Sequence, residues 1–225
     1  MPKVAAIVVS AGAGQRMGSD KTFLMLGDKP LIAWTVDVLQ RSKSVDRIVL
    51  VLQQGKLNEG KKMATARGWS KISSICAGGE LRQDSVKKGL ALVDGCDWVL
   101  VQDGARPFLT EKLIADGLHA AVQTGAAAAA VEVKDTIKQF DEAGMVLQTL
   151  QRDGLRAVQT PQVFRTAILK MAYDTVECTV TDDAAIVELA GYRVKLYPGE
   201  YENIKVTTPE DLLLAEMIAG KRIKS

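Results

Sequence analysis

VAAIVVSAGAGQRMG, residues 4–18, is the stretch that decides the fold class. Residues 4–9 are all apolar, which favours a strand buried on both faces of a sheet. The run then ends in small residues, including Gly12 and Gly14, where backbone N–H groups can approach phosphate oxygens without obstruction. A buried strand followed by such a loop indicates an α/β fold that binds its ligand at the carboxyl ends of the strands.

The glycine loop matches neither of the two common nucleotide-binding fingerprints. The dinucleotide motif needs a third glycine at position 17, where this chain has Met17. The Gly-Lys-Ser/Thr sequence of a P-loop is also absent. Arg16 and Lys21 remain as two cations beside the loop, and they suit a triphosphate. The loop alone leaves open a second interpretation, an ordinary turn followed by a solvated arginine and lysine.

Strand and helix patterns alternate along most of the chain. Strands are predicted at 4–9, 47–52, 71–77, 97–103 and 192–199, and helices at 30–41, 58–67, 81–93, 109–124, 182–190 and 208–220. Pro30 and Pro209 suit first helical positions, and Thr110 and Thr208 suit N-caps. This order predicts an α/β fold with a doubly wound, mostly parallel sheet.

The pattern changes between about residues 126 and 160. Ala126–Ala130 leads into alternating residues that favour a strand, and two further extended segments flank a turn at 141–144. Such a hairpin is poorly covered by its own domain. We therefore interpret residues 134–155, called the arm below, as a dimerisation element on a single domain spanning residues 1–225.

Composition excludes several classes of protein. The 225 residues carry a net charge of +2, so no general affinity for nucleic acid or a membrane surface is expected, and an anionic ligand needs locally placed cations. Three dispersed cysteines and one histidine argue against a zinc site or a disulfide framework, and favour a cytoplasmic protein. No stretch approaches the ~18 apolar residues of a membrane span.

Several polar clusters follow predicted strands. Asp103 ends a buried strand, where it could hold a divalent cation against phosphates, with Arg106 pairing an anion; alternatively, Asp103 caps the next turn and pairs with Arg106. Gly79 precedes a helical stretch with Ser85, which suits recognition of a base edge but also an ordinary turn. Lys205 alternates with apolar neighbours, and is either catalytic or directed to solvent.

Other charged residues have a simpler interpretation. Asp182 and Asp183 fit a helix N-terminus better than a metal pair. Neither a Cys/His nor a Ser/His pair is available for nucleophilic catalysis. Cations that converge on one sheet edge instead favour phosphoryl or nucleotidyl transfer, in which positioning and charge stabilisation supply most of the catalysis.

The motifs SAGAGQRMG, GGELRQDSV, DGARPF, VKDTIK, QRDGL, QTPQVF, TDDA and ENIKVTTPEDL occur in this order. Together they resemble the 2-C-methyl-D-erythritol 4-phosphate cytidylyltransferase family of the non-mevalonate isoprenoid pathway, over residues 3–217. The resemblance implies a reaction of CTP with methylerythritol phosphate that releases pyrophosphate, with a divalent cation, normally Mg²⁺, on the triphosphate. It also implies a homodimer formed through the arm.

The resemblance assigns roles by position. The implied catalytic residues are Arg16, Lys21, Arg152 and Lys205; the implied CTP pocket is Ser10, Ala11, Gly12, Gly14, Gly79, Glu80 and Ser85; the implied polyol-phosphate residues are Asp103, Arg106, Thr136 and Thr160, with Asp103 also at the metal. Two alternatives remain at this stage: a ribitol-5-phosphate cytidylyltransferase, and a non-catalytic nucleotide-binding module on the same fold.

Overall fold

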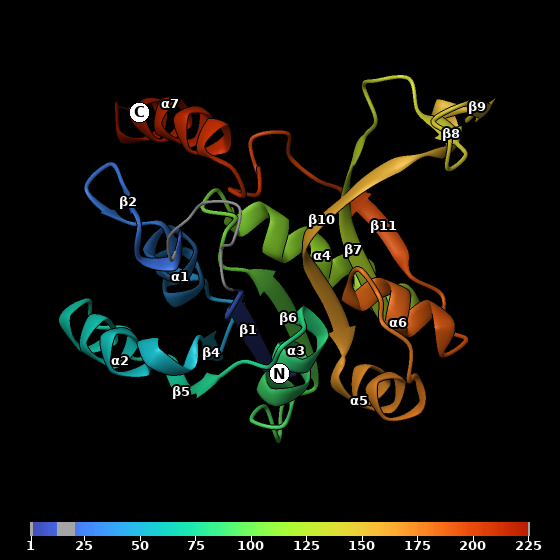
Figure 1. Cartoon of the computed structure of the whole chain (residues 1–225). Helices are drawn as coiled ribbons and strands as arrows, with labels where there is room; N and C mark the ends of the chain where they lie inside the picture. Colours follow the sequence, from blue (N-terminus) through green and yellow to red (C-terminus); the bar gives the residue numbers. More distant parts are fainter. Residues whose placement is uncertain (1, 13–20, 225) are drawn as a thin grey trace.

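A twisted sheet forms the centre of the molecule (Figure 1), and the computed structural model describes residues 2–12 and 21–224. Within these residues seven strands pair in the order β11 (Lys195–Pro198), β7 (Ala126–Glu132), β10 (Arg156–Arg165), β6 (Trp98–Asp103), β1 (Val4–Ser10), β4 (Arg47–Leu52) and β5 (Ile72–Ala77). β10 runs antiparallel to both of its neighbours, and the other pairings in this described sheet are parallel. The mostly parallel sheet predicted from the sequence is confirmed.

Helices cover both faces of the sheet. The core on one face includes side chains of α1 (Leu31–Arg41), α2 (Leu57–Ala66) and α4 (Glu111–Thr124), and the core on the other includes side chains of α3 (Arg82–Leu90), α5 (Thr166–Thr175) and α6 (Asp183–Leu189). Along β1 the side chains alternate between these cores, with Ala6 and Val8 in the first and Ala5 and Ile7 in the second. This arrangement confirms the doubly wound prediction and explains why β1 is apolar throughout.

A third, smaller core fixes the chain near the carboxyl ends of the strands. α7 (Pro209–Lys224) packs there through Ala215 and Ile218 against Phe108, and Val206 is buried with them. The backbone N–H of Val206 donates to the carbonyl of Ala105 at 2.8 Å. The loop that carries Lys205 is therefore tied to the segment that follows β6.

The hairpin of the arm projects away from the sheet (Figure 1). It consists of β8 (Lys138–Phe140) and β9 (Val146–Thr149), which pair antiparallel and are exposed along their whole length. Its side chains include several large apolar residues that are more than half exposed: Phe140, Met145, Val146 and Leu147. The protruding hairpin is confirmed, and its apolar surface is uncovered in the single chain.

Some local predictions are confirmed and others are wrong. Thr110 caps α4 by accepting from the Leu113 N–H at 3.2 Å, and Pro209 begins α7. Pro30 does not open α1 but ends the short strand β3 (Lys29–Pro30), which pairs with β2 (Met25–Leu26). The sequence patterns also missed α5, and they missed most of β10 because Pro161 lies inside that strand. The strand accommodates it where the register with β7 shifts, between Val158 and Gln162.

Three short 3₁₀ helices complete the described elements: η2 (Lys21–Phe23), η3 (Gln54–Lys56) and η4 (Arg152–Gly154). None of the helices described is long and apolar enough to cross a membrane.

Candidate active site

A pocket lies at the carboxyl ends of the neighbouring strands β1 and β6. These two strands form the topological switch point of the sheet, because β4 and β5 are added on one side of β1 and β6 on the other. It holds about 620 Å³ including its open mouth. Its described lining consists of Val9, Ser10, Ala11, Gly12, Thr22, Gly79, Glu80, Leu81, Arg82, Ser85, Asp103, Ala105 and Lys205. The topological switch point of a doubly wound sheet is the expected place for a ligand.

Most of the predicted nucleotide pocket comes together here. Ser10, Ala11, Gly12, Gly79, Glu80 and Ser85 all line the pocket, although they lie about seventy positions apart in two groups. Gly14 and Arg16 lie outside the described residues, as does the side chain of Lys21. The grouping of loop and cations at positions 13–21 therefore stays a prediction.

The second glycine loop is held in shape by Ser85. The Ser85 hydroxyl is buried, accepts from the Gly79 N–H at 3.0 Å and donates to the Leu81 carbonyl at 3.2 Å. A Cβ at Gly78 would stand 2.2 Å from the Ala11 Cβ, so the two loops approach each other too closely for any side chain there. The predicted contact of the Ser85 hydroxyl with a nucleotide base stays a prediction, since this hydroxyl is hydrogen-bonded within its own loop.

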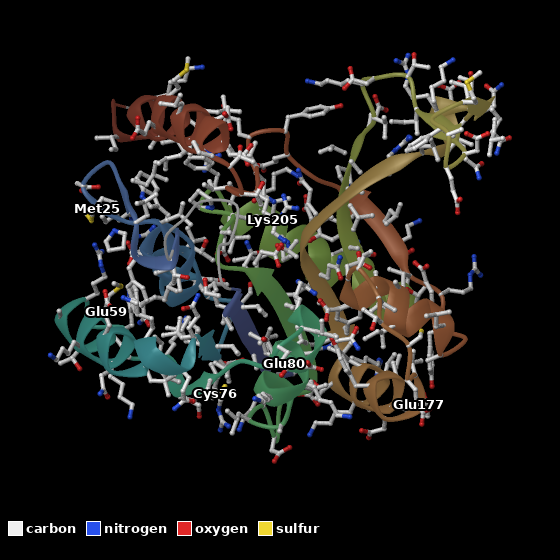
Figure 2. All side chains as sticks on the ribbon, viewed as in Figure 1. Met25, Glu59, Cys76, Glu80, Glu177 and Lys205 are labelled. Carbon is white, nitrogen blue, oxygen red and sulfur yellow. The ribbon has the colours of Figure 1, made fainter. Side chains whose placement is uncertain are left out.

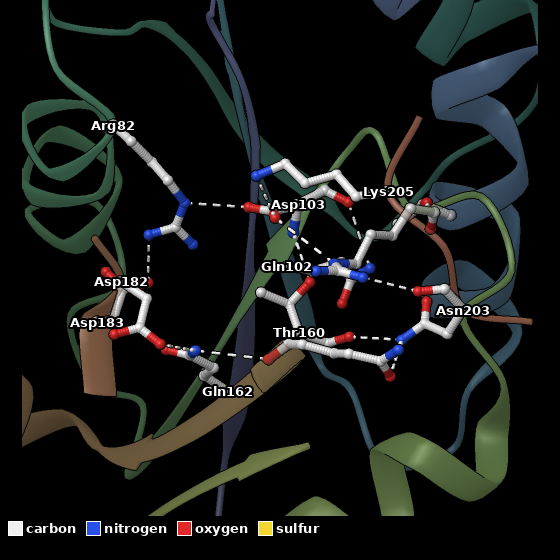
Figure 3. Close-up of polar contacts among 12 residues, drawn as sticks. Arg82, Gln102, Asp103, Thr160, Gln162, Asp182, Asp183, Asn203 and Lys205 are labelled. Carbon is white, nitrogen blue, oxygen red and sulfur yellow. Dashed lines mark hydrogen bonds and ion pairs between the residues drawn. The ribbon is translucent and has the colours of Figure 1, made fainter. Parts of the chain in front are cut away.

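Asp103 is the centre of the charged part of the pocket (Figure 3). It is only 6% exposed, and three cations surround its carboxylate. Arg82 Nε donates to Oδ1 at 3.0 Å, while Lys205 Nζ lies 2.8 Å and Arg106 Nε 3.7 Å from Oδ2. The pairing of Asp103 with Arg106, one of the two interpretations of this motif, is therefore present together with a pocket position.

The charge of Asp103 follows from these neighbours. Burial raises the pKa of its carboxyl, but the positive charges of Arg82, Lys205 and Arg106 outweigh burial, so the pKa lies well below its usual value. Asp103 is therefore ionised throughout the neutral range. The pocket presents cations that are already gathered around one fixed carboxylate before any ligand arrives.

Thr160 and Arg106 build the floor beneath this carboxylate. The Thr160 hydroxyl accepts from the Asp103 N–H at 3.1 Å, and the Thr160 carbonyl accepts from the Asn203 amide at 2.7 Å. Arg106 Nη1 donates to the Asn203 carbonyl at 2.7 Å. These bonds join β6, β10 and the loop before Lys205, and Figure 2 shows Lys205 above the ends of the central strands. Neither Thr160 nor Arg106 lines the pocket directly in the described chain.

Two predicted residues lie elsewhere. Thr136 is exposed in the arm, and Arg152, in η4, donates from Nη1 to the Lys134 carbonyl at 2.6 Å. Arg152 lines a separate hollow with Glu132, Arg156 and Tyr201, among others. Neither residue therefore reaches the pocket of its own chain in this structure.

Arg82 lines the pocket, although no sequence motif singled it out as a functional candidate. It stands at the first position of α3, where a positive charge opposes the helix dipole. That unfavourable placement was the signal available in the sequence, since it indicates a specific partner. The structure supplies two such partners: Nε binds Asp103, and Nη1 donates to Asp183 Oδ2 at 2.7 Å.

Asp182 and Asp183 have different hydrogen-bond partners and different structural roles. Asp182 caps α6 by accepting from the Ala185 N–H at 3.0 Å, as predicted for a helix N-terminus. Asp183 is fully buried, and its carboxylate faces Arg82 and the Tyr173 hydroxyl, which donates at 2.6 Å. Asp183 is therefore part of a buried ion pair as well as of the first helical turn.

Comparison with known proteins identifies relatives along nearly the whole chain. The family model described as IspD, 2-C-methyl-D-erythritol 4-phosphate cytidylyltransferase, matches residues 4–221. Proteins of that name from Dehalococcoides mccartyi and Alkaliphilus metalliredigens are 49% and 45% identical, covering 97% and 98% of this chain and 97% and 94% of their own.

Solved structures agree. The crystal structure of 4-diphosphocytidyl-2C-methyl-D-erythritol synthase from Anaerococcus prevotii is 30% identical with a TM-score of 0.86, covering 97% of this chain and 99% of that one. The 2-C-methyl-D-erythritol 4-phosphate cytidylyltransferase of Thermus thermophilus is 31% identical with a TM-score of 0.80, covering 98% and 100%. With its pocket at the expected sheet edge, this chain belongs to the 2-C-methyl-D-erythritol 4-phosphate cytidylyltransferase family.

Proposed function

We propose that this chain transfers the cytidylyl group of CTP to 2-C-methyl-D-erythritol 4-phosphate. A phosphate oxygen of the polyol substrate attacks the α-phosphorus in line, and the bond from that phosphorus to the bridging oxygen breaks to release pyrophosphate. The family membership supports the reaction. The observation that supports locating the reaction in this pocket is the group of Arg82, Arg106 and Lys205 around Asp103 at the sheet edge.

Among the cations that the structure describes at the pocket, Lys205 is the best placed to act on a phosphate. Its side chain is 38% exposed, and the Asp103 carboxylate is its ion-pair partner at 2.8 Å. A lysine is a point charge on a flexible stem, so it can turn from Asp103 to a substrate phosphate without disturbing the backbone. Lys205 would then orient that phosphate and stabilise the charge that develops during transfer.

The remaining catalytic assignments rest on the family resemblance. Arg16 and Lys21 would stabilise charge on the α- and β-phosphates, and Gly14 would line the triphosphate with Gly12. Ser10 and Ala11 lie beside the described end of this loop, which supports a nucleotide there. Thr160 and Arg106 would act below the pocket, by holding the backbone and carboxylate of Asp103.

The chemistry of the donors fits Mg²⁺ only as an ion held largely by the nucleotide. No cluster of three His, Cys, Asp or Glu side chains able to hold a metal occurs in the part of the chain described. Mg²⁺ typically binds substrate phosphates with one or two carboxylates, and Asp103 would supply a carboxylate once Lys205 turns away. When bound, the ion would neutralise charge on the triphosphate.

We further propose a homodimer in which the arm of one copy reaches the pocket of the other, on a single nucleotidyltransferase domain. The uncovered apolar residues of the hairpin support a partner surface. Thr136 and Arg152 lie outside the pocket of their own chain, so their proposed substrate roles need a partner's pocket. The three cysteines are free, which supports a cytoplasmic location for this enzyme.

The test is release of pyrophosphate by the purified chain with CTP and Mg²⁺. We expect release with methylerythritol phosphate and far less with ribitol 5-phosphate, because the relatives named above carry the methylerythritol name. Activity with ribitol 5-phosphate alone would replace the substrate assignment. No release with either polyol would favour the non-catalytic binding module.

A further inference from the structure

Asp183 is a buried carboxylate to which the reaction described above gives no role. It is fully buried at the start of α6 and does not line the pocket. Both of its oxygens are engaged: Oδ1 accepts from the Tyr173 hydroxyl at 2.6 Å, and Oδ2 accepts from Arg82 Nη1 at 2.7 Å. Burial, followed by the charge of Asp183, raises the pKa of Tyr173, so its hydroxyl stays protonated and donates.

Arg82 connects this buried carboxylate to the pocket. One end of its guanidinium binds Asp183 and the other binds Asp103 Oδ1 at 3.0 Å, as Figure 3 shows. Burial lowers the pKa of Arg82, but the two carboxylates raise it further than burial lowers it. Arg82 is therefore a permanent cation, held between a carboxylate inside the pocket and one outside it.

The cations around Asp103 consequently differ in freedom. The planar guanidinium of Arg82 is paired at both ends, and one of its two partners, Asp183, is fully buried. The Lys205 ammonium has a flexible stem, and the Lys205 side chain is 38% exposed against 25% for Arg82. If Lys205 leaves Asp103 for a substrate phosphate, Arg82 and Arg106 remain beside the carboxylate, and of these two Arg82 donates the hydrogen bond to it, at 3.0 Å against an Arg106 Nε distance of 3.7 Å.

We propose that Asp183 is a positioning residue that acts through Arg82: it holds the Asp103 carboxylate fixed and paired while Lys205 turns to the substrate. Tyr173 supports this role by fixing the Asp183 carboxylate itself. The inference rests on the roles proposed above for Asp103 and Lys205.

The experiment compares Asp183→Asn, Arg82→Met and the double variant in the pyrophosphate assay, with CTP varied at a saturating concentration of methylerythritol phosphate. Asn has the shape of Asp but lacks its charge. We expect kcat to fall about 10- to 100-fold in Asp183→Asn, the scale of a misplaced catalytic group, with the KM for CTP changed less than about threefold. In the Arg82→Met background the second substitution should lower kcat by less than about twofold, because coupled residues are not additive.

A structural role gives a different pattern. If the fold-losses of kcat in the two single variants multiply in the double variant, the inference is overturned. An unchanged kcat in Asp183→Asn would also overturn it. Asp182→Asn is the matched control, since it alters the neighbouring carboxylate and not Arg82, and its kcat should stay within about threefold of wild type. An inactive wild-type protein would instead contradict the proposed function.

Tyr173→Phe keeps the test decisive if Asp183→Asn does not fold. It removes one hydrogen bond to Asp183 and leaves both charges in place. We expect a loss of kcat of about 2- to 10-fold, since one neutral hydrogen bond contributes less than a charge. That loss should again disappear in the Arg82→Met background, and its persistence there would overturn the inference.

Discussion

Lys205→Met separates the contribution of Lys205 to catalysis from its contribution to folding. The substitution keeps most of the apolar stem and removes the ammonium that lies 2.8 Å from Asp103. Because the Lys205 side chain is 38% exposed, its ion pair should contribute only about 0–1 kcal/mol to stability. Arg82 and Arg106 remain to balance the buried carboxylate.

The same substitution should strongly reduce turnover. Loss of one preorganised charge stabiliser typically lowers kcat about 10²- to 10³-fold, or about 2.7–4 kcal/mol in the barrier. Asp103→Asn provides the contrast: it leaves Arg82 and Arg106 without their shared counter-ion, which should cost about 3–5 kcal/mol of folding stability.

Urea unfolding and pyrophosphate release, measured on the same preparations, check both parts. We expect Lys205→Met to unfold within about 1 kcal/mol of wild type while its kcat falls at least 100-fold. A loss of stability near that of Asp103→Asn would refute the idea that Lys205 can leave Asp103 for a substrate phosphate at little cost in folding stability. A kcat reduced less than about threefold would remove Lys205 from the catalytic group.

Three further predictions concern the loops, the arm and α7. Gly78→Ala should lower activity at least 10-fold and stability by about 1–3 kcal/mol, because the new Cβ would stand 2.2 Å from the Ala11 Cβ. Gly55→Ala is the control, since its Cβ would meet no atom within 4 Å. Equal losses in the two variants would exclude a steric cause. Serine at the four exposed apolar positions of the β8–β9 hairpin should convert a dimer to a monomer in sedimentation, whereas a persistent dimer would place the interface elsewhere. Burial raises the pKa of Asp211, but hydrogen bonds from the segment before α7 lower it overall, so Asp211→Ala should cost about 1 kcal/mol at neutral pH. Because the folded pKa is depressed, this difference in urea unfolding should shrink as the pH falls below about 4, and a constant difference would contradict a contribution from the ionised Asp211 carboxylate.

The sequence was sufficient for the part of the site that follows parallel strands. Ser10 and Asp103 are the last residues of β1 and β6, and Gly79 lies two residues beyond the end of β5; these parallel strands end at a common edge. Alternation with apolar neighbours left Lys205 either catalytic or directed to solvent, and the family resemblance assigned it to the site; Val206 beside it is buried. Local patterns could place these residues near one edge of the sheet, whereas their roles came from the resemblance.

Other features depend on contacts between distant segments. The pairing of Arg82 with Asp183 spans 101 positions, and an arginine in a polar helix looks solvated until its partner is known. β10 was missed because a proline usually excludes a central strand, yet a register shift makes room for Pro161. Whether Arg152 serves a neighbouring pocket depends on a second copy, which no pattern within one chain can position.

Asp103 also explains how a nearly neutral chain can prepare a site for a triphosphate. Three cations within a few ångströms repel one another, and the buried carboxylate holds them together before the nucleotide binds. The triphosphate would then replace Asp103 as the counter-ion of Lys205. It follows that Asp103→Asn, although less stable and impaired in turnover, should bind CTP without Mg²⁺ at least about threefold more tightly than wild type, or about 0.7 kcal/mol. The thermal shift produced by CTP in metal-free buffer measures this difference, and a smaller shift in the variant would mean that Asp103 contributes directly to holding the nucleotide.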